Sequence, residues 1–370
     1  METEDLTIFM CGDVMTGRGI DQILPHPVAP RIHEPFMGSA VEYMELAERA
    51  HGPIPRPAGF TYIWGDALDE FRLANPDVKI INLETAVTRS EDYEDKGINY
   101  RMAPDNIPCI TAAGIDCCAL ANNHVMDWGA RGLAETLSTL KNAGLKYCGA
   151  GGNIGEAAAP AVIRTSVGAR VLVFSAGSGT SGIPRHWAAS EDGAGVNLLP
   201  DFAPRAALPL KDQIKRQRRR NDIVVVSIHW GGNWGYDVPE DVRQFAHLLI
   251  DEGGADIIHG HSSHHPRGIE VHNGRLILYG CGDFINDYEA IEGYEDFRAD
   301  LGLMYFAKAD PSSGRLLSLR MTPTLIRRFR VNRAGRDDAL WLRDMLNREG
   351  RRFNTRAEMG EDGRLTLVWD

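Results

Sequence analysis

The sequence lacks the features of membrane-inserted, secreted and nucleic-acid-binding proteins. No window of about 18 to 20 residues is continuously apolar, so no membrane-spanning helix is expected. The first residues, METEDLTIFM, are acidic and run directly into a strand-like segment, unlike a secretory signal. Lys and Arg number 40 against 51 Asp and Glu, a net charge of -11, which disfavours nucleic acid as a partner. We therefore expect a cytoplasmic protein with neither membrane nor nucleic-acid partners.

The sequence also lacks a cysteine framework. Its six cysteines show no CxxC spacing, and several lie in apolar, strand-like runs. This pattern predicts reduced core residues rather than disulfides or a zinc knuckle. The cysteines are Cys11, Cys109, Cys117, Cys118, Cys148 and Cys281.

What the sequence does contain is an alternation of apolar runs and amphipathic stretches. The strand-like runs are Leu6 to Asp13, Val78 to Glu84, Asp116 to Asn123, Arg170 to Gly177, Asp222 to Trp230 and Asp256 to His261. Helical stretches such as GARGLAETLSTLKNAG and PEDVRQFAHLLIDEGG lie between them. Buried strands that alternate with helices predict an α/β protein, and from this pattern alone a single doubly wound sheet.

The later part of the chain has a different pattern. IEVHNGRLILYGCGD predicts a hairpin with Asn-Gly at the turn, and a second strand pair flanks DPSSG. We interpret residues 1–370 as a single domain. In it, the Pro-containing segment at about 25–64 is an insertion that acts as a lid or substrate wall. Residues from about 300 to 370 form a strand-helix-strand extension.

Polar side chains follow the ends of several predicted strands. They include Asp13, Glu84, the Asn122-Asn123-His124 run with Asp127, then His229, His259, His261 and Asp283. Ligands of open α/β sheets bind at the carboxyl ends of strands, so we expect one polar site. Each residue also has an ordinary alternative: Asp13 as a helix cap, the Asn-Asn-His run as a turn, and His259 as a core histidine.

The mixture of carboxylate, amide and imidazole groups is suited to a divalent cation. Such a donor set is compatible with Mn, Fe, Zn or Ca, the oxygen-rich half favouring Ca. The sequence gives no sign of an organic cofactor.

The order of six motifs resembles the CapA-like family of poly-γ-glutamate capsule synthesis proteins, which is similar to calcineurin-like metallophosphoesterases. The motifs are GDVMTGRG, NLETAV, ANNHVMDWG, HWG, GHSSHHPRGIEV and LILYGCGDF. The resemblance implies a central two-sheet β-sandwich flanked by helices, in place of the single sheet. It also implies that His124 is the catalytic acid and that the metal ligands are Asp13, Glu84, Asn123, His229, His261 and His264.

One motif departs from the superfamily pattern. The superfamily has Asp-x-His where this chain has Asp13-Val14-Met15, so one imidazole ligand is absent. A thioether is a poor ligand for a hard or borderline divalent ion. We therefore expect any bound ion, with Ca, Mn or Zn as candidates, to organise the site rather than to activate water.

The resemblance also implies an activity, since the CapA-like family includes a soluble branch of peptide epimerases, and the hypothesis we favour is epimerisation of one residue in a ribosomally made peptide such as a lasso peptide. This reaction needs one acid/base group on each face of the α-carbon. The candidate pairs are His124 with Asp127 and His264 with Asp283, and His259 is a further candidate. Trp230 and Trp234 would form an apolar wall for the substrate.

Two alternatives remain open at this stage. A metal-dependent phosphoesterase or related hydrolase would use the six ligands, with Arg18 and Arg101 holding phosphate oxygens. A factor of poly-γ-glutamate capsule synthesis would bind polymer without catalysis. The expected partner is a peptide or a small acidic or phosphorylated substrate, and the oligomeric state is left open.

Overall fold

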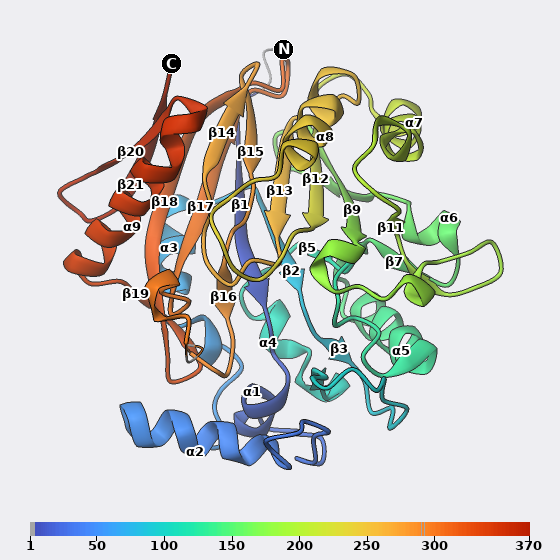
Figure 1. The fold of residues 1–370 in the computed structure, drawn as a ribbon, viewed down its shortest axis with the longest axis vertical. Coiled ribbons are helices and arrows are strands. Elements are labelled where there is room, and N and C mark those ends of the chain that lie inside the picture. Colours follow the sequence, from blue (N-terminus) through green and yellow to red (C-terminus); the bar gives the residue numbers. More distant parts are fainter. Residues whose placement is uncertain (1–3, 290, 292) are drawn as a thin grey trace.

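The strands of the computed structural model, which describes residues 4–289, 291 and 293–370, form two facing sheets (Figure 1). The first sheet has the order β20-β21-β18-β17-β1-β2-β5-β6, with β16 beside β1 and β19 beside β18. Its strands are β20 (Thr355–Met359), β21 (Leu365–Trp369), β18 (Leu316–Arg327), β17 (Leu301–Ala309), β1 (Leu6–Val14), β2 (Val78–Leu83), β5 (Cys117–Ala119), β6 (Lys146–Cys148), β16 (Asp283–Ile285) and β19 (Arg330–Arg333).

The second sheet has the order β11-β9-β12-β13-β15-β14, with β8 beside β9. Its strands are β11 (Leu198–Leu199), β9 (Arg170–Ser178), β12 (Asp222–His229), β13 (Ile257–His261), β15 (Arg275–Leu278), β14 (Ile269–His272) and β8 (Ala161–Arg164). Two short pairs lie outside the large sheets: β3 (Ala86–Val87) with β4 (Arg101–Met102), and β7 (Ala150–Gly151) with β10 (Gly195–Val196).

The helices surround the two sheets, most of them against an outer face and the last one against the cluster between the sheets, to which it contributes Leu342, Met345 and Leu346. They are α1 (Arg18–Ile23), α2 (Ala40–His51), α3 (Ala67–Ala74), α4 (Pro108–Thr111), α5 (Gly129–Asn142), α6 (Ile154–Ala157), α7 (Leu208–Gln217), α8 (Glu240–Asp251) and α9 (Arg336–Gly350). The two-sheet sandwich flanked by helices is therefore confirmed. Among the described residues, we find no helix whose length and apolar character would let it cross a membrane.

Alternate residues of β1 pack into different apolar clusters. Ile8 and Met10 lie in a cluster shared with strands of the second sheet, whereas Phe9 and Cys11 lie in the cluster beneath α1 to α5. Each sheet thus buries both faces, one against helices and one against the other sheet. A strand in a doubly wound sheet is also buried on both faces, so the strand pattern alone could not separate the two architectures. The single-sheet interpretation is wrong.

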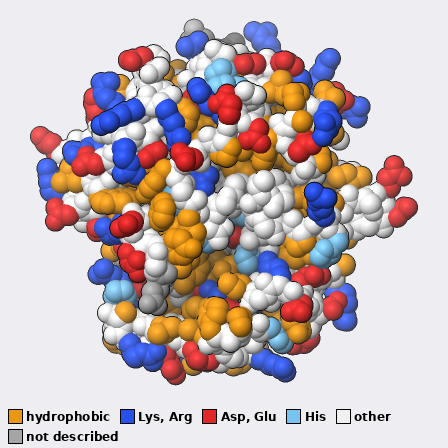
Figure 2. All heavy atoms as spheres, in the orientation of Figure 1, with side chains coloured by type: hydrophobic (Ala, Val, Ile, Leu, Met, Phe, Trp, Pro, Cys, Tyr) orange, Lys and Arg blue, Asp and Glu red, His pale blue; other side chains and the backbone are white. Residues whose placement is uncertain are grey.

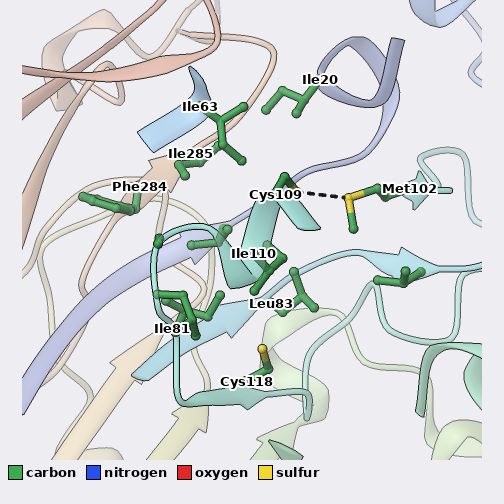
Figure 3. Packing of buried hydrophobic residues seen from close by; sticks show 14 of the residues in the cluster. Ile20, Ile63, Ile81, Leu83, Met102, Cys109, Ile110, Cys118, Phe284 and Ile285 are labelled. Carbon is green, nitrogen blue, oxygen red and sulfur yellow. Dashed lines mark hydrogen bonds between the residues drawn. The ribbon is translucent and has the colours of Figure 1, made fainter. Parts of the chain in front are cut away.

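The cluster under the helices of the first sheet shows this packing at close range (Figure 3). Ile110 of α4 lies against Ile81 and Leu83 of β2, and the thiol of Cys109 donates to the Met102 sulfur at 3.6 Å. All six cysteines are free and buried, as the sequence predicts.

Most predicted elements are confirmed, including the Asn273-Gly274 hairpin between β14 and β15, the β17–β18 pair and α9. β17 pairs directly with β1, so residues after 300 complete the first sheet. The space-filling view shows charged side chains of both signs interspersed over one face of the molecule (Figure 2).

The chain crosses from the second sheet to the first at Gly282, which packs tightly against Gly12. The Asp13 N–H donates to the Gly282 carbonyl at 2.9 Å, and a Cβ at Gly12 would lie 1.7 Å from that same oxygen. That oxygen belongs to the backbone, so it cannot rotate away as the end of a side chain could. This contact fixes Asp13 beside Asp283, with which it is in register.

Gly12→Ala should therefore destabilise the protein by about 3 kcal/mol or more, because the added methyl group must displace backbone. The measurement is urea-induced unfolding followed by circular dichroism. Gly59→Ala is the matched control, since a Cβ there meets nothing within 4 Å. Equal midpoints for the two variants would contradict this view of the sheet junction.

Candidate active site

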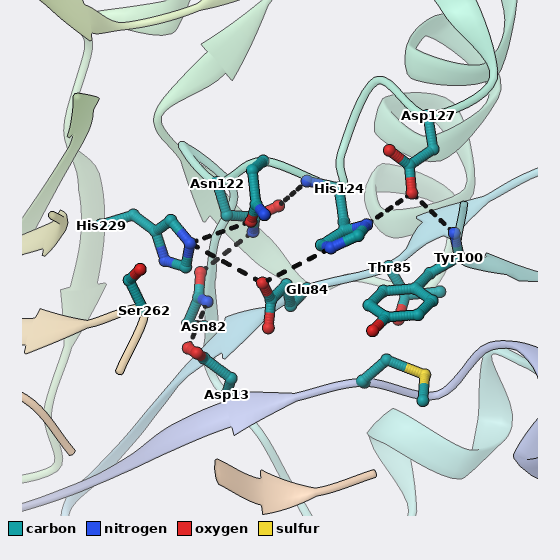
Figure 4. Close-up of polar contacts among 12 residues, drawn as sticks. Asp13, Asn82, Glu84, Thr85, Tyr100, Asn122, His124, Asp127, His229 and Ser262 are labelled. Atoms are coloured by element: carbon teal, nitrogen blue, oxygen red, sulfur yellow. Dashed lines mark hydrogen bonds and ion pairs between the residues drawn. The ribbon is translucent and has the colours of Figure 1, made fainter. Parts of the chain in front are cut away.

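Side chains from both sheets converge where the carboxyl ends of their parallel strands meet. Asp13 comes from the end of β1 and Glu84 directly follows β2, while His229 and His261 end β12 and β13. His124 comes from the loop after β5, and both His124 and His229 point toward the Glu84 carboxylate (Figure 4). The single polar site expected from the sequence is thus present.

Three of these residues form a donor set for a cation. Ligand atoms of Asp13, His229 and His261 all lie within 4.8 Å of one another. The Nδ1 atoms of the two histidines face each other at 2.7 Å, and His261 Nδ1 lies 3.8 Å from Asp13 Oδ1. Asp13 Oδ2 is buried without a hydrogen-bond partner. Paired imidazoles and an unsatisfied carboxylate oxygen fit a divalent ion such as Zn²⁺ or Mn²⁺.

The electrostatics of the site also fit a cation. Burial and the nearby Asp283 carboxylate raise the pKa of Asp13 to about 7. Burial, together with the charges of Asp13 and Asp283, raises the pKa of Glu84. Carboxylates pressed together away from water favour protonation unless a positive charge compensates them. A divalent ion would supply that charge.

The other predicted ligands lie close by but differ in their contacts. Glu84 Oε1 is 3.7 Å from His229 Nε2, and Asn123 Oδ1 is 3.0 Å from the same nitrogen. His264 instead contacts Asp283. Met15 is buried, and its sulfur accepts the Gly17 N–H at 3.1 Å. The side chain therefore stabilises the turn that follows β1.

His124 and Asp127 form a hydrogen-bonded pair. His124 Nδ1 lies 2.6 Å from Asp127 Oδ2, which leaves Nε2 directed toward Glu84 at 4.0 Å. Asp127 is held by the Tyr100 N–H at 2.6 Å and by the Lys96 ammonium at 2.7 Å. Burial lowers the pKa of His124 to about 4, so the imidazole is neutral at pH 7 with a free lone pair on Nε2.

A second pair, His264 with Asp283, lies across the same cavity. His264 Nδ1 is 3.1 Å from both oxygens of Asp283, and the Tyr288 hydroxyl donates to Asp283 at 2.6 Å. Burial lowers the pKa of His264, but the Asp283 carboxylate outweighs it and leaves the pKa above 6.5. The pKa is lowered at His124 and raised at His264, so the first histidine is suited to act as a base and the second as an acid.

Both histidines line a cavity of about 270 Å³. Its polar lining includes Glu84, Lys96, Tyr100, His124, His229 and His264.

His259 and Trp230, which the sequence predicts as site residues, are buried away from the cavity. His259 is fully buried, with Nε2 2.7 Å from the Cys11 carbonyl and Nδ1 3.1 Å from the Ser227 hydroxyl. It lies two residues inside the strand end, beneath His261, and both ring nitrogens are engaged there. Trp230 follows His229, so its side chain turns to the opposite face, where it is buried and donates to the Tyr279 carbonyl.

The two predicted phosphate-binding arginines are also engaged inside the protein. Arg18 is 4 % exposed and bonds Asp287 and Glu34, and Arg101 bonds the Ser90 carbonyl and Glu91. Neither lines the cavity. Trp234, another predicted substrate-binding residue, lies beside His264 of the cavity lining. Its ring is 5.2 Å from that of His264 and stacks on Tyr294 at 4.1 Å.

Sequence reasoning named Asn122 among the polar strand-end residues but missed several others that support the site. Asn82 donates to Asp13 at 2.7 Å and accepts from Asn122 at 3.0 Å, and Asn122 accepts the His124 N–H. This amide chain links the cation donor set to the His124 pair. Lys96, Tyr100 and Tyr288 were also missed, because they lie in loops whose path only the fold determines. The polar Asn82 within an apolar strand was the one available signal.

Comparison with known proteins identifies the family. Residues 7–288 match the family model for the bacterial capsule synthesis protein PGA_cap. The chain belongs to this family. A probable polyglutamine synthesis accessory protein of Mycobacterium tuberculosis is 46 % identical over 366 residues, covering 98 % of this chain and 96 % of that protein.

More distant relatives carry capsule names. The PGA biosynthesis protein CapA of Bacillus subtilis is 32 % identical over 56 % of this chain and 52 % of its own length. The capsule biosynthesis protein CapA of Bacillus anthracis is 28 % identical over 77 % and 61 %. A crystal structure of a phosphatase from Mycoplasma pneumoniae covers 87 % of this chain and 94 % of its own, at a TM-score of 0.47 and 11 % identity. That likeness is too weak to inform activity.

The raised pKa of Asp13 gives a prediction about cation binding. A folded-state pKa of about 7 against the ordinary 3.8 means that, without a cation, stability falls as pH rises from 4 through 7. A cation binds the deprotonated carboxylate, so the increase in Tm on adding Mn²⁺ should be larger at pH 8 than at pH 6. Differential scanning calorimetry measures both.

Asp13→Asn should abolish this pH-dependent increase, because the amide has no charge to compensate. His26→Ala, which removes an exposed imidazole elsewhere, should retain it. An equal increase in Tm at both pH values would exclude Asp13 from the cation site.

Proposed function

We propose that this protein is an accessory enzyme in the synthesis of a glutamate- or glutamine-based polymer and that it hydrolyses an amide bond of that polymer. The observation that carries the proposal is the pair of His–Asp units on one cavity, beside a donor set for a cation. The polymer class is suggested by the names of the relatives.

The two histidines divide the proton transfers of hydrolysis. His124 Nε2 takes a proton from water as the water oxygen forms a bond to the amide carbonyl carbon. The carbon–nitrogen bond then breaks, and His264 gives its proton to the departing nitrogen. Asp127 holds Nδ1–H of His124, which fixes the tautomer that keeps Nε2 available.

Asp13, His229 and His261 are the residues that would hold a divalent ion. When bound, such an ion polarises a carbonyl group and offsets the negative charge of the site. Glu84 lies between His229 and His124 and borders the cavity, where it restricts the position of the attacking water.

The cavity supports an amide better than a phosphate ester. Phosphate binding favours arginine forks, yet Arg18 is paired with the buried carboxylates of Glu34 and Asp287, and the buried Arg101 is paired with the exposed Glu91. Lys96 is the single Lys or Arg among the residues described as lining the cavity, and its ammonium is bound to Asp127. An uncharged amide needs no such cation.

Epimerisation of a residue in a peptide or polymer is the second candidate. The specific observation in its favour is that His124 and His264, each with its own carboxylate, border one cavity and are tuned in opposite directions. One would remove the α-proton and the other would return a proton to the opposite face.

An isotope experiment separates these reactions. The protein is incubated with Mn²⁺ and glutamyl or glutaminyl oligomers in H₂¹⁸O or D₂O, and the products are measured by mass spectrometry. Hydrolysis predicts shortened chains with one ¹⁸O, and EDTA should abolish them. Epimerisation predicts full-length chains that gain one deuterium.

His124→Ala should lower the hydrolysis rate by about 10²- to 10⁴-fold with unchanged circular dichroism, since it removes the base. His26→Ala is the matched control. Unlabelled, full-length oligomers under every condition would contradict the enzymatic proposal, and binding without turnover would favour a polymer-binding role.

A further inference from the structure

A second cluster of metal-ligating side chains lies at the other end of the second sheet. His247 projects from α8, and Glu270 and His272 project from β14; one ligand atom of each lies within 4.8 Å of the others. His272 pairs with Arg275, which is level with the start of β13, whereas His261 ends that strand. His272 is therefore separated from His261 by about 15 Å along the strands. Figure 1 shows α8 and β14, which carry the cluster.

The ligand atoms of the cluster lie close to the spacing that one ion requires. Those of His247, Glu270 and His272 are within 4.8 Å of one another, with His247 Nε2 3.0 Å from Glu270 Oε1, and the neighbouring Asp251 Oδ1 is 2.9 Å from His272 Nε2. Bonds of about 2.0 to 2.2 Å in a tetrahedral zinc site separate neighbouring ligand atoms by roughly 3.3 Å. Small side-chain adjustments would thus bring these atoms onto one ion.

The two imidazoles are stacked face to face, with ring centroids 3.7 Å apart and planes within 5°. The stacking keeps the two imidazoles, one from α8 and one from β14, next to each other. Both side chains are about one-fifth exposed, which gives an ion access from solvent.

Glu270 is oriented for ligation by a neighbour. The Tyr279 hydroxyl donates to Glu270 Oε2 at 2.6 Å, and Oε1 faces both His247 and the Arg243 guanidinium, whose Nη2 lies 3.4 Å away. A carboxylate held in place by a hydrogen bond to its other oxygen is typical of a metal ligand.

We propose that His247, Glu270 and His272 bind a Zn²⁺ ion, with the Asp251 carboxylate adjacent as the fourth donor. Two nitrogen and two oxygen donors suit zinc better than the harder Ca²⁺ or Mg²⁺. Because the donors come from α8 and β14, the ion joins the helix to the β14–β15 hairpin. Its role is structural, and it is independent of the catalytic cavity.

Zinc titration by calorimetry in a variant without the first site tests this proposal. In His261→Ala, one Zn²⁺ site should remain, and Zn²⁺ should raise the Tm. In the double variant His261→Ala/His272→Ala, that remaining site should weaken by at least about tenfold and the increase in Tm should disappear. The matched control is the double variant His261→Ala/His51→Ala, because His51 also pairs with a carboxylate, that of Glu289 at 3.2 Å.

Asp13→Asn provides a second background if His261→Ala fails to fold, as judged by circular dichroism. Co²⁺ absorption bands in either background should report nitrogen and oxygen ligands, and they should be lost with His272→Ala. Unchanged Zn²⁺ stoichiometry and affinity after both His247→Ala and His272→Ala would overturn the proposal.

Discussion

The repulsion among buried carboxylates at the sheet ends is the constraint on which the site depends. Asp13 and Asp283 are in register on adjacent parallel strands, and both raise the pKa of Glu84. Three acids buried this close together are tolerable when positive charge lies between them. His264 supplies part of it, and the donor set of Asp13, His229 and His261 is placed to acquire the rest from a divalent ion.

The surrounding structure holds these groups in place. The Gly12–Gly282 contact sets the register of Asp13 against Asp283, and the amide chain of Asn82 and Asn122 connects Asp13 to the loop of His124. Arg18 bonds Glu34 of the 25–64 segment and also Asp287, and its guanidinium lies 4.7 Å from the Tyr100 ring that lines the cavity. That segment therefore supports the cavity wall; its action as a lid stays a prediction.

The sequence predicted the strand ends well because strand boundaries and polar residues are both local signals. Asp13, Glu84, His124 and His229 could be assigned to one site because parallel strands place their carboxyl ends together. The depth of a side chain could not be predicted. His259 and His261 lie on the same face of one strand and are both fully buried, and only the packing of the second sheet against β1 decides that His259 contacts the Cys11 carbonyl whereas His261 contacts His229.

The roles of the charged residues also could not be predicted from the sequence around each of them. Arg18 and Arg101 stand in motifs that suggest ligand binding, yet their partners Asp287, Glu34 and Glu91 are fixed by the fold. Lys96 has no motif and still reaches Asp127, because the loop that carries it folds back over the cavity. Long-range pairs of this kind determine which cations are free to meet a substrate.

A crystal structure of the protein soaked with Mn²⁺, with anomalous scattering recorded near the manganese edge, tests the central claim most directly. The account predicts an anomalous peak coordinated by Asp13, His229 and His261, with Glu84 next to it. Crystals saturated with Mn²⁺ that show no peak among these residues, while the carboxylates keep their positions, would contradict it.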